Sequence, residues 1–431
     1  MLKLIIHPST LLLNFLLSLC LTLSKPQQLH VVRTVEALIV SDGPKTLANL
    51  YRQWVEAPDV SAASDFFRVS PWSGEEMGEA LMQFVVADAI RRGEAEGAQP
   101  VIYTSLDDSL SGKDKETTAL EGVDWHHDHN ASSKKRSAYR NGMVHVSCRI
   151  QVGEYSYTFA WRLYLRAKTI RRLNRGRSKE NRLRFKSKYT LAREMLTELK
   201  QLIPPGWRVY VLFDRWYASA KLLKFIHRQG KGWDTLCAIK SNRNLDGISL
   251  SEWNQHLKHT RYTPVEVTAA DGSTTRYHVR AVRGYLNQVP FEVCVLISKR
   301  HPRDPHPKYF LCTDLSLSAQ TILKRYFKRW PIEVDYWYLK QRLGLADFRV
   351  QYYEAIHKWY SVVHLTLTFL QWQLHESGQT DSPLRSVAEV IQRHRRHHAR
   401  EVLIAACDQA IADGHMDSVV ERLITSTQVA A

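Results

Sequence analysis

The chain has 431 residues, which at roughly 150 residues per domain corresponds to about three structural units. Hydrophobic residues make up 44% of the sequence and charged residues 24%, a composition that excludes a wholly disordered chain, a collagen-like chain and a multi-span membrane protein. The 60 Lys and Arg residues outnumber the 43 Asp and Glu residues, and the net charge of +17 favours a polyanionic partner. Nucleic acid is the first candidate for that partner, and an anionic membrane surface is the second.

The N-terminal apolar stretch, residues 11–23, resembles the start of a secretory signal because it follows Lys3. Small polar residues recur every four positions along it (Asn14, Ser18 and Thr22), and its larger apolar residues share the opposite helical face. It is also shorter than the roughly 18 residues that cross a bilayer. We therefore expect an amphipathic core helix, no membrane association, and a helical region over residues 1–96.

The cysteines are far apart and form no CxxC pair, which argues against a zinc ribbon or a disulfide framework. We interpret them as buried thiols in a reducing compartment, the cytoplasm. They are Cys20, Cys148, Cys237, Cys294, Cys312 and Cys407.

From residue 99 the pattern changes to strands alternating with helices. Three β-rich runs predict an antiparallel meander, and the later strands are separated by amphipathic helices, giving the order β-β-β-α-β-α-β. The expected strands are 101–106, 142–151, 155–165, 209–213 and 235–239, and the expected helices are 191–203 and 217–229.

A second strand-rich stretch, about 246–307, interrupts this pattern and contains the hairpin signal Asp271-Gly272. A strand at 309–312 and a helical region at 319–344, which includes Pro331, then resume the core. Residues 359–374 predict an apolar helix. Residues 383–431 predict a more polar helical tail, in which His394 to His398 form either a DNA-facing helix surface or solvated charge.

Acidic residues stand at the ends of two expected strands and on one helix. Asp107 and Asp108 follow the first strand, and Asp214 follows the apolar run 209–213. Tyr326, Arg329, Glu333 and Lys340 fall within about 60° of one helix face at 100° per residue. Arg329 and Glu333 taken alone would be an ordinary i, i+4 ion pair, and Pro331 either kinks the helix between them or starts a new one.

These three regions resemble the signature of DDE transposases from bacterial insertion sequences. Tyr-x2-Arg-x3-Glu-x6-Lys matches the family pattern around its last acid at all four positions. Phe213-Asp214-Arg215 resembles the second acidic site, and Leu106-Asp107-Asp108-Ser109 resembles the first. The resemblance extends in order over residues 99–375, including the β insertion between the second Asp and the Glu.

The resemblance implies an RNase H-like mixed sheet flanked by helices, with two Mg²⁺ or Mn²⁺ ions bound by Asp107, Asp214 and Glu333. Hard divalent cations prefer carboxylate oxygens, and two of them can serve the attacking and leaving oxygens of a phosphodiester. Asp107 and Asp108 compete for the first ligand position because neighbouring strand residues point to opposite faces. We choose Asp107 by its match to the family position, and we expect Asp335, on the other side of the helix, to be a surface acid.

Several basic residues are predicted to hold phosphates. Arg329 and Lys340 would do so beside the metals, while Tyr326 either bonds a phosphate or only packs. Residues 166–188 hold eleven basic residues and one acid, so this basic segment is either a solvated linker or a phosphate-binding element. Its candidate phosphate-binding side chains are Arg171, Arg172, Arg175 and Arg177.

Other motifs narrow the reaction. The sequence has no GxxxxGK[ST] loop, so no ATP-dependent step is expected. The histidine-rich stretch 125–129 is either a loop or a metal site that lacks cysteine partners. We predict a nucleoid-associated transposase that acts as a homodimer on double-stranded DNA, at its element ends and at target DNA. The alternatives are an RNase H-like nuclease that cuts without joining and an inactive DNA-binding regulator.

The expected domain boundaries follow these changes in pattern. They are a helical DNA-binding domain at 1–96, a first part of the catalytic core at 97–245, a β-rich insertion at 246–310, a second part of the core with the Glu helix at 311–375, and a basic helical tail at 376–431.

Overall fold

The computed structural model describes residues 3–56, 59–128, 131–132, 136–268, 272–378, 380 and 382–414. Asp271 of the predicted hairpin, His129 of the histidine-rich stretch and the end of the predicted tail lie outside the described residues.

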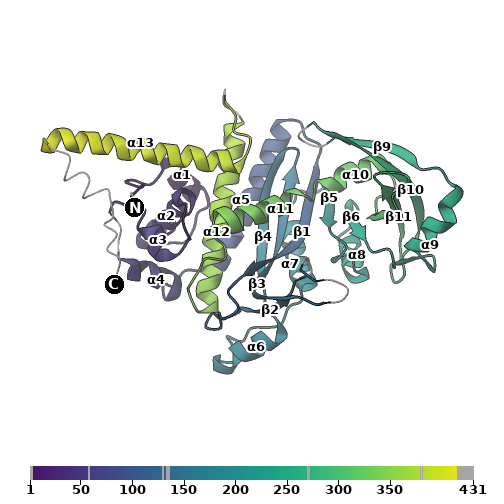
Figure 1. The fold of residues 1–431 in the computed structure, drawn as a ribbon, viewed down its shortest axis with the longest axis horizontal. Helices are drawn as coiled ribbons and strands as arrows, with labels where there is room; N and C mark the ends of the chain where they lie inside the picture. The colour runs from purple at the N-terminus through teal and green to yellow at the C-terminus, as the bar shows by residue number, and fades with distance from the viewer. Residues whose placement is uncertain are drawn as a thin grey trace.

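Ten strands of the described chain form one mixed sheet (Figure 1). Their order is β2-β3-β1-β5-β6-β12-β11-β10-β9, and β4 also pairs with β3. The strands are β1 (Val101–Gly112), β2 (Asp124–His127), β3 (Tyr139–Val152), β4 (Tyr155–Tyr164), β5 (Arg208–Phe213), β6 (Trp233–Ile239), β9 (Thr263–Thr268), β10 (Thr274–Tyr285), β11 (Glu292–Lys299) and β12 (Lys308–Cys312). A small separate hairpin joins β7 (Asn244–Leu245) to β8 (Ile248–Ser249).

The left part of this order, β4-β3-β1-β5-β6, is the RNase H-like arrangement. The strand β3 runs antiparallel to both β1 and β4, whereas β5 is parallel to β1 and β6 is parallel to β5. The continuous apolar run of β5 follows from burial on both faces, because Val209 and Val211 pack in one core cluster while Tyr210 and Leu212 pack in another. The predicted fold class is therefore confirmed.

The predicted β insertion continues the same sheet. The strand β12 pairs antiparallel with β6, and β11, β10 and β9 follow outward as antiparallel neighbours. A short helix, α9 (Leu250–His256), lies between β8 and β9. In Figure 1 these strands extend the sheet to the right of β6.

Helices cover both faces of the sheet. The first face carries α5, α7 and α8, whose apolar side chains share one core cluster with β1, β3 and β5, and the opposite face carries α10, α11 and α12. These helices are α5 (Gly74–Ala95), α7 (Lys188–Leu202), α8 (Ala220–His227), α10 (Ala319–Phe327), α11 (Pro331–Trp337) and α12 (Tyr353–Ser377). The helix α6 (Ala167–Leu173) lies apart from the sheet in Figure 1.

The remaining helices surround α12 on the side away from β1 (Figure 1). The predicted amphipathic helix is α1, in which Leu12 and Phe15 are buried, and the Phe15 ring lies 5.3 Å from that of Phe369 on α12. These helices are α1 (Thr10–Ser18), α2 (Lys25–Val40), α3 (Leu47–Tyr51), α4 (Val60–Arg68) and α13 (Val387–Asp413). No helix in the described ranges is both long enough and apolar enough to span a membrane.

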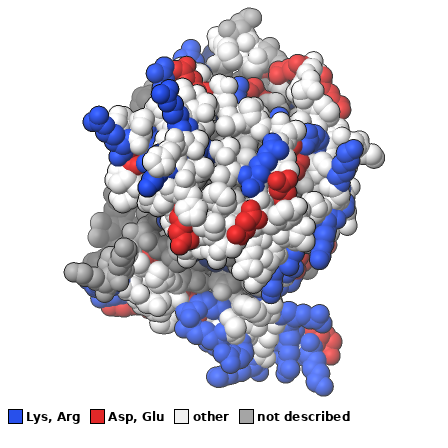
Figure 2. All heavy atoms as spheres, turned by 90° about the vertical axis from the view of Figure 1, so that its right-hand side faces the viewer, with Lys and Arg blue, Asp and Glu red and all other residues white. Residues whose placement is uncertain are grey.

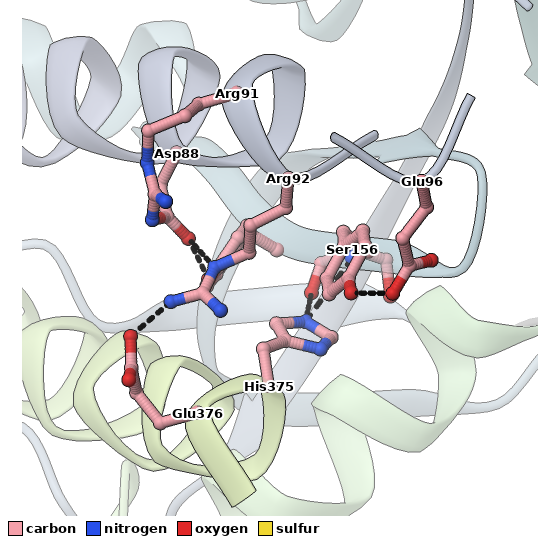
Figure 3. A network of polar contacts seen from close by, with 9 residues as sticks. Asp88, Arg91, Arg92, Glu96, Ser156, His375 and Glu376 are labelled. Atoms are coloured by element: carbon pink, nitrogen blue, oxygen red, sulfur yellow. Dashed lines mark hydrogen bonds and ion pairs between the residues drawn. The ribbon is translucent and has the colours of Figure 1, made fainter. Parts of the chain in front are cut away.

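A buried charge network joins α5 to β4 and α12 (Figure 3). Asp88 accepts hydrogen bonds from Arg92 at 2.6 Å and from the Tyr157 hydroxyl at 2.5 Å, and Arg92 also pairs with Glu376. Arg92 is buried, so its charge needs these partners. Because α5 and α12 both contact the sheet through this network, the helical N-terminal region is anchored directly on the core.

Two sequence interpretations were wrong in part. Cys20 and Cys407 are exposed, although the other four thiols are buried as expected. His394 and His398 are buried rather than solvated or DNA-facing, because α13 lays this face against α2.

Candidate active site

Asp107 and Asp214 stand next to each other at the ends of two parallel strands. Leu106 of β1 pairs with Phe213 of β5, so each aspartate directly follows one residue of this pair. Neighbouring strands of a sheet lie about 4.8 Å apart. Adjacent residues on parallel strands point to the same face, and for these aspartates it is the face opposite the one on which Leu106 and Phe213 pack. Asp107 therefore points toward α11.

Glu333 lies in the first turn of α11. Pro331 starts this helix because it has no N–H to donate to a carbonyl of α10. The turn between the two helices keeps hydrogen bonds that span three residues, from the Ile332 N–H to the Arg329 carbonyl and from the Glu333 N–H to the Trp330 carbonyl. The segment thus continues a helical course through the proline. Of the two outcomes predicted at Pro331, the structure has the new helix.

Arg329 connects the first and third acids. One of its guanidinium nitrogens lies 2.9 Å from Asp107 Oδ2 and 3.3 Å from Glu333 Oε1. A single nitrogen atom is therefore in contact with both carboxylates. Three acids from β1, β5 and α11, with one cation between two of them, form the candidate active site.

The carboxylates oppose one another electrostatically. Burial raises the pKa of Asp107 to about 8, aided by the charges of Asp214 and Glu333, while Arg329 acts in the opposite direction. Burial also raises the pKa of Asp214, against hydrogen bonds from the backbone of Trp216 and Tyr217. An all-oxygen donor set whose acids repel one another fits hard divalent cations, which would relieve the repulsion.

We expect the metal-free protein to lose stability as the pH rises from about 4 to about 8. The folded-state pKa of Asp107 lies above its ordinary value, so the folded chain binds this proton more tightly than the unfolded chain does. The stability that this proton contributes is complete at a pH below the ordinary pKa and is lost as the pH rises through the folded-state pKa. The melting temperature measured in the presence of a chelator should therefore decrease as the pH rises from about 4 to about 8. Mg²⁺ should raise the melting temperature more at pH 8 than at pH 5. Asp107→Asn should flatten both trends, and equally steep trends in this variant would contradict the assignment.

Asp108 points to the opposite face of β1 from Asp107. Its carboxylate accepts hydrogen bonds from Lys188 at 2.6 Å and from the Tyr217 hydroxyl at 3.0 Å. Lys188 begins α7 and ends the basic segment, so this hydrogen bond ties that segment to the site. The geometry favours Asp107 over Asp108 as the acid that faces Glu333.

The prediction for Asp335 was wrong. This residue is buried, pairs with Arg149 of β3, and accepts hydrogen bonds from Thr158 at 3.0 Å and from the Gln371 amide at 2.9 Å. The face of α11 opposite Glu333 packs on β3, β4 and α12 instead of facing solvent, so its acid requires buried partners. This network holds the helix that presents Glu333.

The other residues of the helix signature lie around the acids. The ring of Tyr326 packs 4.8 Å from that of Phe310, and burial raises the pKa of its hydroxyl to about 12. Lys340 lies in a π-helical turn, Tyr338–Arg342, that follows α11. Burial and the Arg140 charge lower the pKa of Lys340, against the charges of Glu333 and Asp108, so this lysine lies within electrostatic range of the acids.

The basic segment forms α6 and the short turn Asn174–Gly176 (η1). Arg171, Arg172 and Arg175 are exposed, whereas Arg177 pairs with Glu354 at 2.5 Å and is mostly buried. Figure 2 shows basic side chains gathered on a lobe at the lower end of the molecule, where Figure 1 places α6. Three of the four arginines of this segment that are predicted to bind phosphate thus present their charge to solvent.

A cleft of about 750 Å³ opens beside Asp214 and Arg329. Sequence reasoning gave no role to its basic and aromatic lining, which includes Lys240, Arg300, Lys308, Trp216 and Trp330. Trp330 is 64% exposed, and the Lys240 ammonium lies 4.0 Å above the Trp216 ring. A signal existed for Lys240 alone, because it follows a strand parallel to β5 and therefore lies at the same sheet edge as Asp214.

The histidine-rich stretch forms the edge strand β2 and its end. Asp124 to His127 pair with β3, His126 is buried, and burial lowers its pKa to about 4. Within the described residues this stretch brings no three metal-ligating side chains together. The described part of the stretch is thus an edge strand, neither the predicted loop nor a metal site.

Comparison with known proteins agrees with this geometry. The family model for the DDE superfamily endonuclease matches residues 19–286, which include Asp107 and Asp214 and end before Glu333. The chain therefore belongs to the DDE superfamily endonucleases, and the predicted DDE resemblance is confirmed.

Among solved structures, the chain is similar to a piggyBac transposase in a synaptic complex with hairpin DNA, seen by cryo-electron microscopy. The sequence identity is 13%, the TM-score is 0.46, and the match covers 94% of this chain and 78% of that one. A search of curated protein sequences gives no match.

Proposed function

We propose that this protein is the transposase of a bacterial insertion sequence, which binds the terminal inverted repeats of its element, cleaves there and joins the ends to new DNA in the nucleoid. The observation that carries the proposal is the contact of Asp107 and Glu333 with the same Arg329 nitrogen, with Asp214 beside Asp107 at the end of the neighbouring strand. Such a carboxylate set suits phosphodiester chemistry with hard divalent ions better than acyl or redox chemistry.

In this proposal Asp107, Asp214 and Glu333 hold two Mg²⁺ or Mn²⁺ ions. Bound ions would supply activation of the attacking oxygen and stabilisation of the leaving oxygen in an in-line displacement. Arg329, displaced from the acids by the ions, and Lys340 would then bind phosphate oxygens of the DNA. Tyr326, which lines the same cleft as Arg329, would bond a phosphate or only pack against Phe310.

The surfaces around the acids support DNA as the substrate. The cleft beside Asp214 combines exposed tryptophans with lysine and arginine, a combination that binds unstacked nucleotides through stacking and charge. The lobe of α6 adds a second basic surface, and Lys188 at the end of the basic segment binds Asp108, the neighbour of Asp107 in the chain. We assign recognition of the inverted repeats to the helices of residues 1–96 and expect a homodimer on paired ends.

The test is incubation of the purified protein with labelled element ends, Mg²⁺ and a target plasmid. Cleavage at the ends followed by joining to the plasmid supports the transposase. Cleavage without joining identifies a nuclease instead, and end binding without metal-dependent cleavage identifies a regulator. If the protein shows no specific interaction with the ends, the proposal is overturned.

The basic segment is expected to contribute charge without sequence selectivity. Arg171→Ala/Arg175→Ala should weaken binding to any duplex and reduce the slope of log affinity against log salt by about 0.9 for each phosphate that is no longer neutralised. Arg228→Ala/Lys231→Ala is the matched control, since these exposed cations precede β6 at the sheet end away from the acids. Equal slopes for the two variants in a fluorescence anisotropy titration would exclude α6 from the DNA interface.

A further inference from the structure

A buried cluster of metal-ligating side chains lies outside the candidate active site, where α13 crosses α2. Within the described residues, Glu36, His394 and His398 form the one group of three such residues whose potential ligand atoms all lie within 4.8 Å of one another. Each of them is at most 5% exposed. In Figure 1 both helices lie on the far side of α12 from β1 and β5, so this cluster is separate from the catalytic acids.

The sequence places the two histidines for a shared ligand. His394 and His398 are four residues apart on α13 and therefore lie one above the other on a single helix face. Glu36 faces them from α2, with its Oε2 atom 3.0 Å from His398 Nε2 and its Oε1 atom bonded to the backbone N–H of Ser9 at 2.8 Å. Two imidazoles and a carboxylate are a common zinc donor set.

The surroundings of the histidines are those of ligands. The Nδ1 atom of His398 lies 3.3 Å from Glu401 Oε2, an ion-pair distance without hydrogen-bond alignment, and a carboxylate behind the imidazole is the usual partner of a metal-bound histidine. Gln373 brings its amide oxygen 2.8 Å from His394 Nε2, so the His394 ring is also oriented by a polar partner behind it.

The alternative to a metal ion is a proton shared by His398 and Glu36. Such a proton explains why these two side chains lie together, but it does not explain why a second imidazole, that of His394, lies near the same carboxylate. A buried ion pair between His398 and Glu36 would also contribute little net stability.

We propose that Glu36, His394 and His398 bind one Zn²⁺ ion, which fastens α13 to α2. Ligand atoms around a tetrahedral zinc lie about 3.3 Å apart, so the cluster needs only a small contraction from its present spacing. Arg395 already pairs with Asp42 at 2.5 Å and donates to the Ser41 carbonyl, so α13 is held against the end of α2 beside the site.

The experiment uses the full chain, freed of metal, with Co²⁺ as a spectroscopic probe and Zn²⁺ as competitor. The expected result is one strongly absorbing Co²⁺ ion per chain, with the visible spectrum of a four-coordinate ion bound by two imidazoles and a carboxylate, displaced by one equivalent of Zn²⁺. The catalytic acids offer oxygen only, so ions bound there would give weak absorption and leave this signal unaffected. Absence of the strong signal overturns the proposal.

Variants connect the signal to the cluster. Glu36→Gln keeps the side-chain volume and an acceptor for the Ser9 N–H, and it should weaken Zn²⁺ binding at least about 100-fold, as should His394→Ala. The matched control is His397→Ala, which removes a 54% exposed imidazole from the same helix and should leave binding unchanged. Zinc should also slow protease cleavage of α13 in the unaltered chain but not in Glu36→Gln. Unchanged binding in Glu36→Gln, or equally weakened binding in His397→Ala, would refute the site.

Discussion

Glu333→Gln is expected to reduce metal-dependent cleavage of element ends at least about 1,000-fold, because the loss of several kcal/mol of metal-derived transition-state stabilisation corresponds to a factor of this size. Binding to the same ends should stay within about twofold, since the change leaves every basic surface intact. The fold should persist as well, because Glu333 is 40% exposed and Arg329 keeps Asp107 as its partner. Single-turnover cleavage and an anisotropy titration measure the two quantities.

The neighbouring aspartates supply the control for this prediction. Asp107→Asn should match the effect of Glu333→Gln, because both side chains are proposed ligands of the same ions. Asp108→Asn should retain metal-dependent cleavage at a reduced rate, since Asp108 faces Lys188 and Tyr217 on the other side of β1. An inactive Asp108→Asn beside an active Asp107→Asn would show that Asp108, not Asp107, is the first ligand. Loss of DNA binding in both variants would instead indicate misfolding.

The sequence was sufficient for features that depend on local pattern. The apolar run of β5 predicted a strand buried on both faces, and Asp214 at its end was placed at the sheet edge. The spacing of Arg329 and Glu333 predicted their ion pair, which survives Pro331 because the turn keeps the helical course.

Features that depend on long-range packing were not predictable in the same way. Asp335 reads as a surface acid because one helix alone does not reveal that β3, β4 and α12 enclose its other side. His394 and His398 likewise sit in a run of basic residues, and only the position of α2 buries them. The cleft combines residues from five segments of the chain, so its shape has no signature in any one of them.

Arg149→Met is expected to cost about 3–5 kcal/mol of unfolding free energy, because it leaves the buried Asp335 carboxylate without its cation. Burial already raises the pKa of Asp335 against the charge of Arg149, so without that charge the acid must take up a proton or remain as an unpaired buried charge. Urea unfolding followed by tryptophan fluorescence measures the cost. The matched control is Arg162→Met on β4, whose pair with Glu198 is about 30% exposed and should cost less than about 1 kcal/mol.

Arg149→Met also tests whether Asp335 of α11 supports the position of the candidate catalytic acid Glu333. Asp335 anchors α11 to β3 and α12 two residues after Glu333, so loosening the anchor should lower cleavage by folded molecules while the acids themselves are unchanged. Arg149→Met/Asp335→Leu removes both charges and should recover much of the stability, since replacing a buried pair by apolar side chains is often neutral. If the double variant is no more stable than Arg149→Met alone, the cost of removing Arg149 comes from packing and not from the unpaired carboxylate.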